Sequence, residues 1–408
     1  MKNINKLFRK TFIFCTLFFV IKSQSQELQS YLKQAMANNP EIQKFELQYN
    51  IASEKVNGVN ALPNTEFGAS YFVSEPETRT GAQRFKLSVK QMLPWFGTIT
   101  SRENYISSLA DATYEDIVIA KRKLITSVSQ SYYNLYANTA KQKVLEENIK
   151  LLETYETIAL TSVEVGKASA VDVLRLQMRQ NEMEQLLAIL NQQYLTEKTI
   201  FNKLLNRDKS ISINILSDLN FPSEDFEMNT NTLEVHPELL KYDKLYQSIE
   251  TSELLNKKES APMIGFGLDY INVAERPNMN FSDNGKDILM PMVTVSIPIF
   301  NNSYKSKTKQ NSLQQQEILA QKQERKNTLE TFLDKAINER IAARISYKTQ
   351  TKNLKQAKNA EEILIKNYET GTIDFNDVLD IQELQLKFEM NQIESIKSYF
   401  IQTTIINY

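Results

Sequence analysis

Two long stretches of the chain combine helical spacing of apolar residues with a complete absence of glycine and proline. They run from Thr98 to Val165 and from Ile299 to Thr370. Apolar residues three, four or seven positions apart share one face of an α-helix. We therefore expect two very long helices, each with one apolar stripe. The stripes are Ile117, Leu124, Val128, Tyr132 and Leu135 in the first, and Leu329, Leu333, Ile337, Ile341 and Ile345 in the second.

The expected helices are far longer than those of ordinary globular domains. At 1.5 Å per residue, a helix of roughly 70 residues is on the order of 100 Å long, against a mean of about 11 residues per helix. Helices of this length need coiled-coil or tubular packing to bury their stripes.

A glycine ends each long stretch, and a second stretch without glycine or proline follows it. Gly166 precedes Val171 to about Asn206, and Gly371 precedes Asn376 to Tyr408. Glycine supplies the positive φ that terminates a helix. An acidic residue near the start of the next helix, here Asp172 and Asp377, complements the positive end of that helix. Each pair of stretches is therefore expected to form a long helical hairpin.

The residues around the two glycines are similar in sequence. "VEVGKASAVDVLRLQ" (163–177) and "YETGTIDFNDVLDIQ" (368–382) are identical at six of fifteen positions, at a constant offset of 205 residues. A similarity at so long a period indicates a duplication. We therefore expect an internal two-fold sequence repeat.

Alternation of apolar and polar residues marks four short segments near the remaining glycines and prolines. The alternating residues are Phe67, Ala69, Tyr71 and Val73; Phe85, Leu87 and Val89; Ile264, Phe266, Leu268 and Tyr270; and Val293, Val295, Ile297 and Ile299. A period of two is typical of a strand with one apolar face. The segments predict two β-hairpins.

These elements give an expected organisation in three parts. Residues 1–25 form a signal peptide, 26–221 a first structural repeat and 222–408 a second. Each repeat contains a helix, a β-hairpin and a long helical hairpin. The β-hairpins span about 64–93 and 263–298, and the helical hairpins about 98–206 and 300–408.

The N-terminus has the pattern of a secretory signal. Basic residues precede the apolar run from Thr11 to Ile21, and small polar residues follow it, with cleavage expected near Ser25. The run has about half of the ~20 residues of a spanning helix, which leaves a membrane-anchored helix as the weaker alternative. Cys15, the only cysteine, lies in the run, so the mature chain would contain neither a disulfide nor a thiolate site.

Composition excludes several classes of function. The net charge of −1 provides no global field for nucleic acid, so we expect no nucleic-acid partner. No P-loop, dinucleotide-binding glycine pattern, nucleophile elbow or paired-histidine motif occurs. The only histidine, His236, is expected to begin a helix before Pro237. We therefore expect no enzyme activity, no catalytic or metal site and no cofactor.

The four strands leave two structural alternatives open. They could form a small soluble sheet within one chain, or they could join strands of other subunits in a closed β-barrel, because the smallest single-chain barrels use eight strands. Each hairpin continues at a proline into a long helix, which favours a barrel wall that continues into a tube.

With these elements combined, the chain resembles the TolC family of outer-membrane efflux proteins over essentially its whole mature length. The resemblance is carried by "NNPEI" near the start, "ALPN" before the first strand, and "QMLPWFG" and "VSIPIFNNS" at the ends of the hairpins. It also includes "VG" and "DVL" at the first turn and "TGTIDFNDVLD" at the second. The order, duplication and spacing of these short motifs carry the specificity.

The resemblance implies a mainly α-helical fold with a small β part. Four strands from each chain of a homotrimer would form a 12-stranded transmembrane β-barrel in the cell outer membrane, in contact with its lipid. Long coiled helical hairpins would form a periplasmic tunnel that tapers to the two turns. The duct would dock on a periplasmic adaptor (membrane fusion) protein, which couples it to an inner-membrane pump of the RND or ABC type.

The implied function is passive exit of substrates from the periplasm to the outside, in a tripartite efflux pump or a type I secretion system. The alternative from another class is a periplasmic coiled-coil scaffold or adaptor with a soluble β-sheet and no channel. The exported substrates could be drugs, metal ions, metabolites or proteins.

The resemblance also assigns expected roles to residues. The periplasmic gate would be lined by Asp377, Asp380 and Tyr368. The turns in contact with the adaptor would include Gly166, Lys167, Asp172, Gly371, Thr372 and Asp374. From the alternation, the lipid face of the barrel would include Phe67, Tyr71, Phe85, Leu87, Val89, Phe266, Leu268, Tyr270, Val293 and Val295.

Simpler interpretations remain beside these roles. Asp377 could merely complement the start of its helix, and the turns could be hairpin turns without a partner. Trp95 and Phe96, which follow Pro94, could belong to an interfacial aromatic belt or to ordinary packing.

Overall fold

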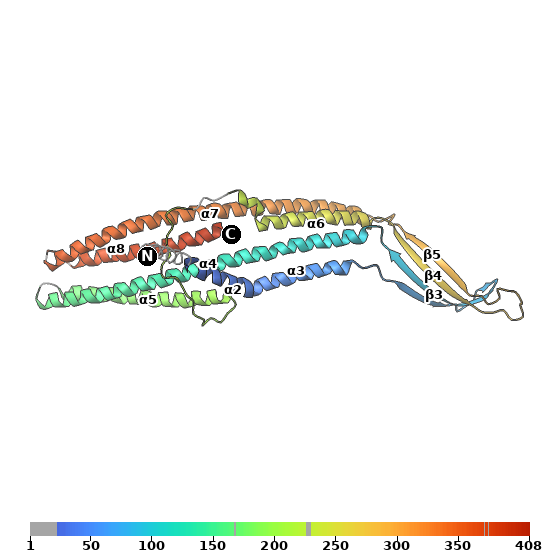
Figure 1. Ribbon diagram of the computed structural model, residues 1–408, viewed down its shortest axis with the longest axis horizontal. Coiled ribbons are helices and arrows are strands. Elements are labelled where there is room, and N and C mark those ends of the chain that lie inside the picture. Colours follow the sequence, from blue (N-terminus) through green and yellow to red (C-terminus); the bar gives the residue numbers. More distant parts are fainter. Residues whose placement is uncertain (1–22, 167–168, 226–229, 371, 374) are drawn as a thin grey trace, which may run out of the picture. The chain divides into compact units, whose positions relative to one another are not determined.

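The computed structural model describes residues 23–166, 169–225, 230–370, 372–373 and 375–408 (Figure 1). Most of the expected signal peptide, residues 1–22, lies outside these ranges. The chain forms two compact units. The first contains Met1–Gln43, Ile119–Asn231 and Thr328–Tyr408, and the second contains Lys44–Val118 and Thr232–Asn327. Both expected repeats, 26–221 and 222–408, contribute to each unit, and their boundaries stay a prediction.

Helices make up most of the described chain, with one small sheet. They are α2 (Ser23–Asn38), α3 (Pro40–Val59), α4 (Thr98–Glu164), α5 (Ala170–Leu204), the short 3₁₀ helix η1 (Thr230–Val235), α6 (Pro237–Glu259), α7 (Ser303–Glu369) and α8 (Asn376–Ile406). The two very long helices expected from the sequence are α4 and α7, each of 67 residues. Within the described residues, no helix combines the length and apolar character needed to cross a membrane.

The apolar stripe of α4 is buried from Ile117 to Leu135, as predicted, whereas that of α7 is buried only in part. Leu329 is 5% exposed, but Ile341 and Ile345 are 44% and 62% exposed. The reason is geometric. A step of four residues advances about 40° beyond a full turn, so a stripe that repeats strictly every four residues rotates around the helix. Ala336 and Ala343 are the buried apolar residues of α7 in this region.

The core of the first unit packs the helical hairpins together. One cluster contains Leu145, Leu152, Tyr155 and Ala159 of α4, Val173, Leu176, Met183 and Leu190 of α5, and Phe375, Val378 and Leu386 near the start of α8. A second cluster joins α2, α3, α4, the end of α5 and Ile213. Helix α8 therefore shares one apolar interior with α4 and α5 near the hairpin turns, although it is far from both in sequence.

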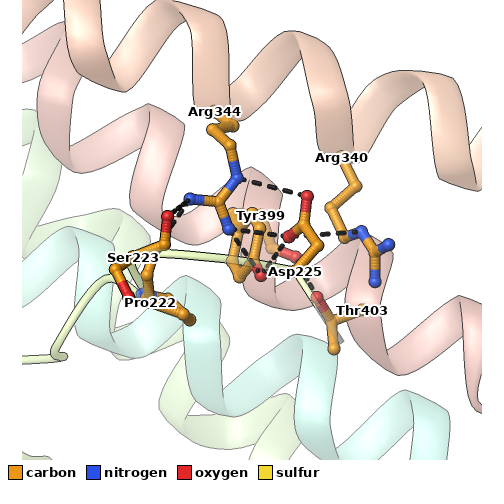
Figure 2. Close-up of polar contacts among 7 residues, drawn as sticks. All are labelled: Pro222, Ser223, Asp225, Arg340, Arg344, Tyr399 and Thr403. Carbon is orange, nitrogen blue, oxygen red and sulfur yellow. Dashed lines mark hydrogen bonds and ion pairs between the residues drawn. The ribbon is translucent and has the colours of Figure 1, made fainter. Parts of the chain in front are cut away.

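A polar cluster ties the connector after α5 to α7 and α8 in the same unit (Figure 2). Asp225 accepts hydrogen bonds from Arg344 Nη2 at 2.7 Å and from the Tyr399 hydroxyl at 2.6 Å. Arg344 also donates to the carbonyl oxygens of Pro222 and Ser223. The connector is thus held at its backbone and at one side chain.

Aromatic stacking reinforces the cluster around Asp225. The rings of Phe221 and Tyr347 are parallel within 6°, with centroids 4.1 Å apart. The Arg344 guanidinium lies over the rings of Phe221 and Tyr399 at 5.1 Å. Stacking of this kind adds to the hydrogen bonds of a planar guanidinium.

The second unit contains an antiparallel sheet in the order β1-β3-β4-β5. The strands are β1 (Glu66–Tyr71), β3 (Gly81–Leu93), β4 (Met263–Val273) and β5 (Ile288–Ser296), and the two-residue β2 (Glu77–Thr78) pairs with β3. β3 and β4 join the two expected hairpins into one sheet. β5 ends at Ser296, so Ile297 and Ile299 lie beyond the strand in which the alternation placed them. Pro298 has no N–H to continue the ladder.

Candidate functional site

The first hairpin turn is closed by a capping box. Gly166 has φ +72°, which ends α4 in the left-handed region. The Ser169 hydroxyl accepts a hydrogen bond from the N–H of Val171 at 3.2 Å, and the Asp172 carboxylate accepts one from the N–H of Ser169 at 3.2 Å. Asp172 is therefore 7% exposed and is used inside its own chain.

The second hairpin turn is built differently. The N–H and hydroxyl of Thr372 both donate to the carbonyl of Asn367, at 3.0 and 2.8 Å. Phe375 takes the N-cap position of α8 without a side-chain capping bond. Asp377 and Asp380 lie on the first turns of α8, and both are exposed. The predicted acidic pair thus faces outward on one helix face.

Tyr368 lies under this turn rather than on its surface. Its ring meets Phe375 edge-on, with centroids 4.8 Å apart. Its hydroxyl oxygen is buried and has no hydrogen-bond partner among the described residues. A buried hydroxyl without a partner is energetically costly and marks a place where a partner can bind or a conformation can change.

Three of the residues expected at the turns, Lys167, Gly371 and Asp374, lie outside the described residues. Gly166 and Thr372 are exposed, as contact with an adaptor requires. The gate and adaptor assignments therefore stay predictions.

Two polar contacts that the sequence did not indicate join the starts of α5 and α8. Arg175 Nη1 donates to Asn376 Oδ1 at 2.5 Å. Arg179 Nη2 lies 3.5 Å from Glu383 Oε2. The two helical hairpins of one chain are therefore linked just beyond their turns.

A glutamate held by two glutamine amides closes the first helical hairpin. On α5, Gln177 Nε2 donates to Glu156 Oε1 of α4 at 2.7 Å. Gln180 Nε2 donates to Glu156 Oε2 at 3.1 Å. We call Glu156, Gln177 and Gln180 the first clamp. Each carboxylate oxygen thus has its own amide donor across the hairpin.

The second helical hairpin contains the same arrangement. On α8, Gln382 Nε2 donates to Glu361 Oε1 of α7 at 2.8 Å, and Gln385 Nε2 donates to Glu361 Oε2 at 2.7 Å. We call Glu361, Gln382 and Gln385 the second clamp. The sequence contained a signal for both clamps. Gln177 and Gln382 occupy matching positions of the repeated motif, and Glu156 and Glu361 are separated by the same offset of 205 residues.

The sheet of the second unit presents one apolar face. The strand registers place the ten residues predicted for the lipid face on the same side, because Phe67 is opposite Val89, Val89 opposite Leu268, and so on across the sheet. Phe67 and Val293 are 82% and 68% exposed. Phe85, Val89 and Tyr270 are half-buried. Contact of this face with lipid stays a prediction.

The acidic and imidazole side chains of the described ranges do not form a metal site. No group of three or more His, Cys, Asp or Glu side chains there could hold a metal ion. His236 caps α6 by accepting a hydrogen bond from the N–H of Glu238.

Known proteins share both sequence features and the fold of this chain. Residues 31–207 match the family model described as outer membrane efflux protein. None of the curated protein sequences matches the chain significantly. The fold is similar to that of the outer-membrane channel OprN, with a TM-score of 0.76 and 14% identity, over 94% of this chain and 89% of OprN.

Two further structures have similar folds. The outer membrane protein VceC of Vibrio cholerae gives a TM-score of 0.74 at 14% identity, over 94% of this chain and 96% of VceC. The MtrE outer membrane channel of Neisseria gonorrhoeae, in its open state, gives 0.75 at 15% identity, over 93% of this chain and 88% of MtrE. Residues 31–207 therefore resemble the outer membrane efflux protein family in sequence, and nearly the whole chain has the fold of these outer-membrane channels.

Proposed function

We propose that the protein is the outer-membrane channel of a tripartite efflux pump or a type I secretion system. Substrates would pass through it from the periplasm to the outside without chemical change. The match of residues 31–207 to the outer membrane efflux protein family supports this function. The single observation that carries the proposal is the sheet of the second unit.

The sheet has two free edges and one exposed apolar face. β1 and β5 are its outer strands, and every residue of β1 is exposed. Edge strands present backbone N–H and C=O groups that pair readily with another chain. A barrel in a membrane removes such edges, and it needs an apolar outer face. Both needs are met if β1 of one copy pairs with β5 of the next.

Three copies would supply the strands that one copy lacks. Four main strands per chain give twelve in a homotrimer, above the minimum of about eight for a barrel. We therefore propose a trimeric barrel in the outer membrane, with the helical hairpins as a periplasmic tunnel. The long coiled helices, which need partners along their length, support this arrangement.

The hairpin turns would form the periplasmic end of the tunnel. Asp377 and Asp380 are exposed on one face of α8, so three copies would place six carboxylates around the entrance. Such a ring attracts cations and repels anions. The exposed turns at Gly166 and Thr372 would contact a periplasmic adaptor, which in turn binds an RND or ABC pump.

The first test is the subunit number of the mature protein, extracted in detergent from the outer-membrane fraction and measured by light scattering corrected for bound detergent. Three subunits are expected. A monomer that stays soluble without detergent would overturn the channel and favour a periplasmic scaffold.

The gate is tested separately, by conductance in planar bilayers. Asp377→Asn with Asp380→Asn should lower the permeability ratio of cations over anions, because the ring of charge is removed. Glu146→Gln with Glu147→Gln removes the same charge from exposed positions of α4 and should leave the ratio unchanged. An unchanged ratio in the aspartate variant would remove the gate role and leave the channel standing.

A further inference from the structure

The first and second clamps are the same arrangement, but only the second is covered by another hairpin. Gln382 and Gln385 are 3% and 8% exposed, whereas Gln177 is exposed. The cover comes from α4. The Tyr155 hydroxyl donates to Glu361 Oε1 at 2.9 Å and accepts from Gln382 Nε2 at 3.3 Å. In the first clamp, which has identical chemistry, Gln177 is exposed and Glu156 and Gln180 are half-buried in the single chain.

The chemistry of Tyr155 fits this covering role. The phenol of Tyr155 is a neutral donor at physiological pH, and burial and its hydrogen bond to Glu361 raise its pKa further above the ordinary value. A neutral donor satisfies the carboxylate without adding a second charge to the interior. The contact between the hairpins of one chain is therefore a specific polar contact at this level.

The offset of 205 residues identifies what would cover the first clamp. It relates Tyr155 of α4 to Ala360 of α7, and Gln382 of α8 to Gln177 of α5. The in-chain contact between Tyr155 and Gln382 thus corresponds to a contact between Ala360 and Gln177. If each hairpin meets the next in the same way, the hairpin that contributes Ala360 belongs to a different copy from the one that contributes Gln177.

A second contact points to the same surface. Within the chain, Arg179 of α5 lies 3.5 Å from Glu383 of α8. The offset relates these residues to Leu384 and Met178, which are 42% and 58% exposed. Large apolar side chains at matching positions gain stability when they are buried against each other. Their exposure in the single chain is explained if they meet between copies.

We propose that α5 of one copy packs against α7 and α8 of a second copy, with Gln177 at Ala360 and Met178 at Leu384. The inference rests on the proposed function and names the surface that builds the tunnel. We call the contact between two neighbouring helical hairpins a seam. The seam within a chain and the seam between copies then differ in chemistry. Within a chain the contact adds the hydrogen bonds of Tyr155 and an ion pair to its apolar cluster. Between copies, Ala360, Met178 and Leu384 take the places of those polar side chains.

Disulfide trapping tests the seam in the full-length trimer, because the only native cysteine is Cys15 of the expected signal peptide. The variant Gln177→Cys with Ala360→Cys is oxidised in outer-membrane fractions and run on non-reducing gels. Covalent dimers and trimers are expected, since each copy contributes one cysteine to each neighbour. Met178→Cys with Leu384→Cys is an independent second pair with the same expected ladder.

Two matched controls define the result. Tyr155→Cys with Gln382→Cys should form its disulfide within one chain and migrate as a monomer. Ala360→Cys with Gln193→Cys should give no ladder, because Gln193 lies about 24 Å further along α5 than Gln177, beyond the reach of a disulfide.

The possible outcomes distinguish a failure of the proposed seam from a failure of the proposed channel. A ladder from either test pair, absent from both controls, supports the seam. A protein that is trimeric by light scattering but gives no ladder from either pair overturns the seam alone. A monomeric protein overturns the seam together with the channel.

Discussion

Asp225 is a carboxylate whose charge stabilises the fold of the first unit (Figure 2). Its hydrogen bond from Arg344 holds the pKa of the carboxyl below its ordinary value of 3.8. A carboxyl with a lowered folded-state pKa contributes stability that is fully present above the unfolded pKa. That contribution is lost as the pH falls through the lower, folded-state pKa. The link between the connector and α7 is therefore expected to be intact at neutral pH and to weaken below about pH 4.

Asp225→Asn should lower the free energy of unfolding by about 1 to 3 kcal/mol at neutral pH, because Arg344 loses its charged acceptor. The difference from the parent should shrink as the pH falls below about 4, because the parent carboxyl binds a proton first in the unfolded chain and, at the lower folded-state pKa, in the cluster itself. Thermal unfolding followed by circular dichroism at several pH values measures this. Glu224→Gln, at the exposed neighbouring position, is the control and should match the parent. A difference independent of pH would show that the charge of Asp225 is not what stabilises the cluster.

The aspartates of the two turns should respond differently to substitution. Asp172→Ala removes half of a capping box and should cost about 1 kcal/mol of stability. Asp377→Ala leaves the N-cap of α8 unchanged, because Phe375 caps that helix without a side-chain hydrogen bond, and should cost less. Paired thermal melts of the two variants compare them directly. Equal losses would mean that Asp377 stabilises its helix as much as Asp172 does, which is the simpler role for that residue.

At the scale of elements, periodicity predicted which segments form helices and strands. It did not predict which face of a long helix is buried, because that face depends on how the apolar stripe rotates along the helix. The stripe of α4, from Ile117 to Leu135, keeps an average close to the helical repeat of about 3.6 residues and stays buried. The stripe of α7 repeats every four residues, so it drifts, and Ile345 is exposed. The element was predicted correctly, but the face that it buries was not.

Periodicity could not predict polar contacts between residues that are far apart in the sequence. Asp225 and Arg344 are 119 residues apart, and the connector that holds Asp225 has no periodic pattern. The clamps are an exception, because their glutamates follow the repeat. The offset of 205, extended beyond the repeated motif, relates Glu156 to Glu361 from the amino-acid sequence alone. A duplicated sequence can thus reveal a polar contact when its period is applied to every polar residue.

Glycines in a strand and in a helix should have opposite effects when replaced. Gly81 begins β3 with φ +136°, and a Cβ there would lie 1.9 Å from the carbonyl oxygen of Ala274. Gly81→Ala should therefore lower stability by about 1 to 3 kcal/mol. Gly58 lies in α3 with nothing within 4 Å of an added Cβ, so Gly58→Ala should raise stability by about 0.4 to 1 kcal/mol. Denaturant titrations measure the free energy of unfolding of both variants. A Gly81→Ala protein as stable as the parent would contradict the close approach at β3.

At the scale of the whole molecule, exposed apolar side chains gather where the strands end. β3 and β5 run in the same direction, since each is antiparallel to β4. Their C-terminal ends therefore lie at the same end of the sheet. Trp95 and Phe96 follow β3 and are 38% and 80% exposed, and Phe300 follows β5 and is 98% exposed. Aromatic residues are enriched where a membrane meets water. This position therefore favours the interfacial belt over ordinary packing.

Trp95 is the only tryptophan of the chain, so its fluorescence reports the depth of this end of the sheet in a bilayer. In vesicles, lipids brominated near the headgroup should quench Trp95 more than lipids brominated near the chain ends, because a belt residue sits at the interface. Trp95→Phe with Leu268→Trp moves the probe to the middle of the apolar face and should reverse the order of quenching. Quenching of both proteins by iodide alone would place the sheet in water and contradict the membrane-spanning barrel, whereas a reversed order locates both its interface and its interior in lipid.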